Sequence, residues 1–85
     1  MQALQINDKP TIEFRVHLGD FIMSWADTSN GKRFPIRIGR RYTRDVWNVL
    51  WHDSALVAAF ESHEEEVRAA AEAAYLAGKN ELHLV

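Results

Sequence analysis

The length, composition and charge of this chain exclude several classes of protein. Its 85 residues are 47% hydrophobic and 26% charged, an ordinary globular composition in a length that supports one core, so we expect a single domain over residues 1–85. The chain has no cysteine, which excludes a disulfide framework, a thiolate metal site and a cysteine nucleophile. Its net charge of −2 conceals a strong asymmetry, because residues 32–44 carry six basic and no acidic side chains, whereas residues 45–85 carry eight acidic and two basic ones.

The N-terminal segment does not have the pattern of a targeting signal. Residues 1–10 contain no basic region followed by an apolar core, and no window of the chain approaches 18 consecutive apolar residues. We therefore expect a cytoplasmic protein that does not contact a membrane.

The first clear element is a strand over residues 11–18, where apolar and polar side chains alternate with the period of a half-buried strand. Gly19 and Asp20 can supply a two-residue turn with glycine at its first central position. The segment 21–26 then continues the alternation, with one of its two faces directed at the core. The sequence therefore predicts a hairpin.

Turn-forming residues at 28–31 lead into a third predicted strand over 34–38, where Pro35 favours an edge or a bulge because it donates no ladder hydrogen bond. Two short apolar runs, 46–51 and 55–60, predict a second hairpin around a polar turn.

The best marked element is a helix over residues 63–77. Ser62 followed by Glu65 has the spacing of a capping box, and Gly78 is suited to the position that follows a helix. A short last strand is predicted over 81–85. Together these elements predict an α+β fold, a mainly antiparallel sheet of five to six short strands with one C-terminal helix packed on one face.

The basic run is the feature that bears most directly on function. Guanidinium groups bind phosphates and carboxylates in bidentate fashion, and an interleaved tyrosine can stack on a base. On this interpretation the segment binds nucleic acid or a partner protein. On the alternative one, it forms a solvated rim that the acidic helix neutralises. The candidate binding residues are Arg33, Arg37, Arg40, Arg41, Tyr42 and Arg44.

The predicted helix is strongly acidic at its beginning. Glu64 and Glu65, with neighbouring glutamates, could imitate phosphates or dock on a basic partner. The alternative is that they serve the helix itself, since carboxylates stabilise the first turn through the helix dipole. We keep both as candidate binding residues.

The three tryptophans allow two interpretations. All of them can belong to the core, since a small domain needs large apolar side chains inside. If the sheet has an uncovered face, however, one or more would lie in an interface, because Trp, Tyr and Arg are enriched at binding hot spots.

No residues form a catalytic or metal-binding pattern. The four histidines are scattered without a zinc spacing. His52, Asp53 and Ser54 are triad types, but neighbours in a turn do not face one another as nucleophile, base and orienting acid. We therefore expect no catalysis, no metal and no cofactor.

Part of the sequence resembles a known class in its layout. Trp47-x-Val49 is followed by Ala58-Ala59-Phe60-x-Ser62-x-x-Glu65, an alanine-rich helix and a short strand. About half the chain in this way resembles small phage-encoded proteins, including some anti-CRISPR proteins. The resemblance implies a stoichiometric inhibitor of a host defence nucleoprotein complex and transfers no site residues.

Three functional hypotheses follow from the sequence. The first is a non-enzymatic protein-binding module with a protein or nucleoprotein partner, of which the phage inhibitor is one form. The second is a nucleic-acid-binding domain that uses the basic run. The third is a homodimer or larger homo-oligomer that pairs edge strands.

Overall fold

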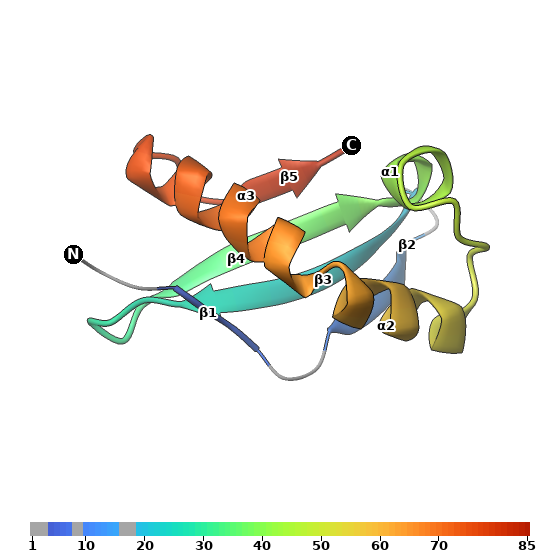
Figure 1. Ribbon diagram of the computed structural model, residues 1–85, viewed down its shortest axis with the longest axis horizontal. Coiled ribbons are helices and arrows are strands. Elements are labelled where there is room, and N and C mark those ends of the chain that lie inside the picture. The colour runs from blue at the N-terminus through green and yellow to red at the C-terminus, as the bar shows by residue number, and fades with distance from the viewer. Residues whose placement is uncertain (1–3, 8–9, 16–18) are drawn as a thin grey trace.

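A computed structural model describes residues 4–7, 10–15 and 19–85 of the chain. The described part is an α+β domain that contains five strands and three helices (Figure 1). In chain order these are β1 (Gln5–Ile6), β2 (Thr11–Arg15), β3 (Gly19–Asp27), β4 (Arg33–Gly39), α1 (Arg40–Asp45), α2 (Asp53–Ser62), α3 (Glu64–Leu76) and β5 (Leu82–Leu84).

The strands form one mixed sheet around β3 and β4. β1 and β2 pair antiparallel with opposite ends of β3, so that they share one edge of the sheet. β3 pairs antiparallel with β4 along its length, whereas β5 pairs parallel with β4 and forms the other edge. Parallel neighbours need a crossover, and the three helices between β4 and β5 supply it.

The core lies between the sheet and the helices, and α2 and α3 lie in front of the sheet in Figure 1. Alternate residues of β3 and β4 point toward the helices, and Ile22 faces Ile38 across the two strands. Burying each aliphatic side chain of this size stabilises the fold by about 1.5–3 kcal/mol. The buried side chains from the two layers include Ile22, Ile36, Ile38, Leu56, Phe60, Val67 and Ala71.

The predicted second hairpin is wrong, because its second run lies in α2. Leu56, Ala59 and Phe60 are buried at helical spacing, and residues 48–50 form an irregular connection. A short apolar run rich in alanine fits a strand and a buried helix equally well, and here the length of α2 and its packing in the core decide for the helix. The chain therefore has three helices in the described part, not one, and its sheet is mixed.

The predicted capping box does not form either. Ser62 is the last residue of α2, and its hydroxyl donates to the Ala58 carbonyl at 2.8 Å. His63 lies between the two helices and makes no side-chain cap to α3. The helix itself is confirmed, since the predicted range 63–77 differs from α3 by one residue at each end. Gly78 follows it with a φ of 83°, as predicted.

The first hairpin is confirmed as a pairing, but its turn is wrong. Arg15 pairs with Gly19, so Gly19 and Asp20 belong to β3 instead of the turn. The part of the predicted first strand at 16–18 lies outside the described residues. The strands at 34–38 and 81–85 are confirmed as β4 and β5. Pro35 precedes the stretch of β4 that pairs with β5, so the strand has a local edge there.

Candidate functional site

One face of the sheet is not covered by any helix in the described part of the chain. Alternation along β3 places Phe21, Met23 and Trp25 opposite the core-facing side chains, and all three are half-buried without belonging to the core. We call this surface the open face. Its described members on or beside β3, β4 and β5 are Phe21, Met23, Trp25, Asp27, Arg33, Pro35, Arg37, Glu81 and His83.

Two arginines of β4 stack on aromatic rings of β3 across the open face. The Arg33 guanidinium lies 5.6 Å from the centre of the Trp25 ring, and that of Arg37 lies 5.6 Å from the centre of the Phe21 ring. The strand register explains both contacts. Arg33 lies opposite Asp27, two residues from Trp25, and Arg37 lies opposite Met23, two residues from Phe21. A cation–π contact at an exposed site contributes about 0.5–1 kcal/mol. The pairs therefore hold the guanidinium groups over the aromatic rings of β3.

Each of these arginines also has a carboxylate neighbour. Arg33 Nε lies 3.7 Å from an oxygen of Asp27, and Arg37 Nε lies 3.6 Å from an oxygen of Glu81. Distances of this length leave Arg37 Nε without a hydrogen bond among the described residues. Exposed ion pairs contribute little, so a partner can replace the carboxylates at small cost. Among its described members, the open face is close to electrically neutral.

The predicted basic segment does not form one continuous patch. Arg33 lies at the beginning of β4, Arg37 lies in the middle of the open face, and the remaining arginines lie on α1 beyond the other end of β4. Seven strand residues at about 3.3 Å each separate the two ends by roughly 23 Å. The structure therefore distributes these side chains over three places.

The arginines of α1 have local contacts. Arg40 stacks over the Trp51 ring at 5.7 Å, and Arg44 Nε donates to an oxygen of Asp45 at 2.9 Å. This hydrogen bond raises the pKa of Arg44 and, with the charges of Arg44 and Arg41, lowers the pKa of Asp45. Of the cations on α1, at least one is thus already matched by a neighbouring carboxylate.

The acidic beginning of α3 does not pair with the arginines of the open face. Glu64 lies 4.0 Å from Arg68 of its own helix, and Glu66 accepts a hydrogen bond from the Tyr42 hydroxyl at 3.3 Å. Glu65 is exposed. The structure thus joins Tyr42 to the acidic helix and leaves Glu64 and Glu65 on a surface separate from Arg33 and Arg37.

The tryptophans divide between the two layers. Trp47 is buried and stacks on the His63 ring with 4.6 Å between centres and 13° between planes. Trp51 packs against the core from the same side. Trp25 alone of the three lies on the open face. Trp47 and Trp51 therefore fit the core interpretation, whereas Trp25 fits the interpretation of an uncovered sheet face.

His52, Asp53 and Ser54 begin α2 instead of forming a turn. The Ser54 hydroxyl lies 3.0 Å from His52 Nδ1, a contact that sequence reasoning did not foresee. Both side chains are exposed, whereas an activated serine requires a base that a third group orients. Among the residues described, no three His, Asp or Glu side chains gather closely enough to hold a metal ion.

Sequence reasoning did not identify the open face because it left undecided which face of the segment 21–26 is directed at the core. The opposite side of the strand carries Ser24 and Ala26, which suit the close approach of helices. Large residues on one side and small ones on the other were a signal that the small side faces the helix layer.

Comparisons with protein-family models, with curated proteins and with solved structures found no match to this chain. No helix in the described ranges is both long and apolar enough to cross a membrane.

Proposed function

We propose that this chain is a non-enzymatic protein-binding module and that its open face is the interface. The observation that carries the proposal is the pair of arginine–aromatic stacks, Arg33 on Trp25 and Arg37 on Phe21, on a sheet face without a described helix over it. Aromatic residues, methionine and arginine are the types enriched in the centre of protein interfaces. The stacks present these groups already ordered, which lowers the entropy cost of binding.

The charges of the open face favour a protein over a nucleic acid. Binding to single strands uses a positively charged groove that follows the phosphates. Here Asp27 and Glu81 accompany the two arginines, and the other cations of the basic run lie at different places. A protein partner with exposed carboxylates and apolar side chains can replace Asp27 and Glu81 while it covers Met23 and Trp25.

The inhibitor role implied by the layout resemblance is one form of this function. A small domain without a catalytic centre acts by covering a surface of its partner, one molecule for one. The partner would then be a protein or nucleoprotein of the same cytoplasm. Glu64 and Glu65, on the helix layer, would form a separate surface for a basic region of such a complex.

Site-specific photocrosslinking tests the proposed interface. A benzophenone side chain is introduced at Met23, and at exposed Ala58 on α2 as the matched control. The proposal expects position 23 to give a defined protein adduct in a lysate of the source cell and position 58 not to give it. Arg37→Glu should remove the adduct, because it reverses the charge that meets the partner. The same adduct from both positions would contradict the proposal.

Nucleic-acid binding is tested by fluorescence anisotropy with generic single-stranded DNA and RNA. Each phosphate contact would contribute about −0.7 to the slope of log affinity against log salt. We expect no salt-steep binding between about 50 and 200 mM salt. A steep slope that disappears in the double variant Arg40→Glu and Arg41→Glu would replace the protein-binding proposal with the nucleic-acid one.

A further inference from the structure

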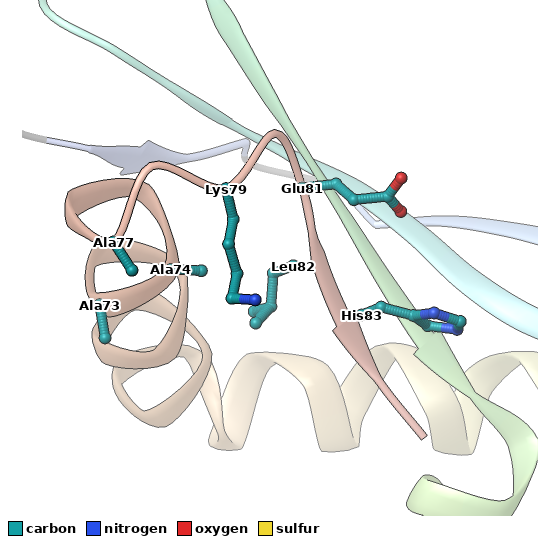
Figure 2. A pocket seen from close by; sticks show the side chains of 7 residues that line it. All are labelled: Ala73, Ala74, Ala77, Lys79, Glu81, Leu82 and His83. Carbon is teal, nitrogen blue, oxygen red and sulfur yellow. The ribbon is translucent and has the colours of Figure 1, made fainter.

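A second surface lies where the β5 edge of the sheet meets the end of α3. The two elements enclose a hollow of about 440 Å³ (Figure 2). A volume of this size lies within the range of sites that bind ligands or side chains of a partner. Ala73, Ala74 and Ala77 line it on the helix side, Lys79 lines it from the turn after α3, and Glu81, Leu82 and His83 line it on the β5 side.

The outer edge of β5 is unpaired among the described strands. In the described part of the chain β5 pairs with β4 alone, on its inner side, through residues 36–38. Backbone N–H and C=O groups on an unpaired edge are a template for a further strand. Strand addition to an edge is a common mode of peptide recognition, in which the backbone gives affinity and pockets for alternate side chains give specificity.

The hollow has an apolar wall and a positive charge. Alanine side chains on α3 leave space that longer residues would fill, and Leu76 in the last turn of α3 is 71% exposed. In Figure 2 the Lys79 side chain extends along the gap between α3 and β5, whereas Glu81 and His83 point away from the helix. Of the two charged residues that line the hollow, Lys79 is thus the one whose side chain lies between α3 and β5.

We propose that the β5 edge binds an extended segment of the partner protein by strand addition. An apolar side chain of that segment occupies the alanine-lined hollow, and an acidic side chain two residues away, on the same face of the added strand, pairs with Lys79. This inference rests on the proposed function and deepens it. Side chains of the added strand alternate between the two faces, so those directed away from α3 reach the open face beside His83, which lies next to Arg37 of β4.

The length of β5 favours a segment of a partner over a second copy of this chain. Three strand residues span roughly 10 Å. Stable dimers bury about 800 Å² on each partner, which an edge this short does not provide by itself. A peptide segment can bind through a smaller buried area than a stable dimer needs. Its contacts with the β5 edge are supplemented by the complementary charge at Lys79 and by the open face next to β5.

A library of displayed random decapeptides is the probe. Selection on the whole chain should enrich sequences in which an Asp or Glu lies two positions from an apolar residue, because only residues at that spacing share one face of a strand. One enriched peptide is then synthesised and titrated into the ¹⁵N-labelled protein. We expect amide hydrogen exchange of Leu82, His83 or Leu84 to slow on binding, the signature of a new strand, and the failure of any sequence to enrich would overturn the inference.

Two variants test the hollow with the same peptide. Ala73→Trp fills it and Lys79→Glu reverses its charge, and each should weaken binding by at least about tenfold. Ala69→Trp is the matched control on the same exposed side of α3, because helical side chains tilt toward the N-terminus and away from the hollow. Circular dichroism confirms that each variant folds. If Ala73→Trp, Lys79→Glu and Ala69→Trp all bound the peptide with the affinity of the wild type, the proposal would be overturned.

The test separates this inference from the proposed function. Arg37→Glu removes the open-face adduct if the proposed function is correct, whereas Ala73→Trp removes peptide binding if a partner segment occupies the hollow. If Arg37→Glu removes the adduct but Ala73→Trp does not affect peptide binding, the proposed function is retained and the inference about the hollow is overturned. Sedimentation velocity tests for a dimer. A dimer that dissociates in Ala73→Trp would show that a second copy of the chain occupies the hollow, and would also overturn the inference.

Discussion

Tyr42 and Glu66 connect α1 to α3 through a hydrogen bond in which the phenol donates to a carboxylate oxygen at 3.3 Å. Burial raises the pKa of Tyr42 above its usual value, and the charge and hydrogen bond of Glu66 raise it further. The folded protein therefore holds the phenol proton more tightly than the unfolded chain does. By linkage, the stabilisation is present below the unfolded pKa of about 10 and is lost as the pH rises through the folded pKa.

The first prediction concerns alkaline stability. In Tyr42→Phe the titrating phenol is absent, so the variant should lose less stability than the wild type from about pH 9 to pH 11. At neutral pH the two proteins should differ by no more than about 1 kcal/mol, since the hydrogen bond is long and exposed. Urea unfolding followed by tryptophan fluorescence at each pH measures the difference. Parallel loss of stability in both proteins would show that Tyr42 does not contribute to it.

The second prediction compares two leucines of very different exposure. Leu56 of α2 is 0% exposed in the core, whereas Leu50 in the preceding connection is 84% exposed. Leu56→Ala leaves a cavity and should destabilise the fold by about 2–5 kcal/mol, while Leu50→Ala should change stability by less than about 0.5 kcal/mol. Both changes in stability are measured by urea denaturation, and the slope of the unfolding free energy against urea concentration should be the same in the two variants. Similar effects of the two substitutions would contradict the place of α2 in the core.

These leucines also show why part of the fold could be predicted and part could not. Strict alternation identified β2, β3 and β4, and the alanine-rich acidic segment identified α3. Residues 55–60 have no such distinctive periodicity over their short length, and only tertiary packing of Leu56 and Phe60 selects the helix. The Ser62–Glu65 spacing was likewise uninformative, because Ser62 bonds back to α2.

The candidate site was predictable in composition but not in arrangement. The sequence identified Arg33 and Arg37 as available cations, and both lie on the open face. It did not reveal that β4 separates the cluster into three places, since strand register depends on pairing with β3. The hollow beside β5 depends on a parallel pairing to β4, which no local pattern in residues 81–85 specifies.

The third prediction concerns two buried hydroxyl groups. Thr43 is fully buried and its hydroxyl donates to the Arg40 carbonyl at 2.8 Å, whereas Ser24, also fully buried, has a hydroxyl without a hydrogen-bond partner in the described residues. Thr43→Val should cost about 1 kcal/mol, because it removes a satisfied bond. Ser24→Ala should be neutral or stabilising, because it removes an unpaired polar group at little cost in volume.

Thermal and urea unfolding of the two hydroxyl variants check this contrast. Loss of more than about 1 kcal/mol in Ser24→Ala would mean that the hydroxyl makes a hydrogen bond in the native protein. Thr43→Ser and Thr43→Ala both lack the buried methyl group and differ only in the hydroxyl, so Thr43→Ser should retain more of the stability if the Arg40 contact contributes.

The fourth prediction concerns the turn that leads from α3 to the β5 edge. The Lys79 amide donates to the Ala74 carbonyl at 3.0 Å and the Gly78 amide to that of Tyr75 at 3.1 Å, the two bonds of a Schellman motif. The motif requires the left-handed conformation that Gly78 adopts, with a φ of 83°. It directs Lys79 and Leu82 toward the hollow, so the turn matters for both stability and peptide binding.

Gly78→Ala should therefore destabilise the protein by about 1 kcal/mol, because a side chain at positive φ is strained. Gly39→Ala is the matched control: its φ is −75° and the added methyl group would lie 3.4 Å from the Leu84 carbonyl oxygen, an ordinary contact. That variant should be neutral or stabilised by a few tenths of a kcal/mol, since alanine restricts the unfolded chain. Equal melting temperatures for both variants would show that the left-handed conformation of Gly78 does not contribute to the stability of the fold.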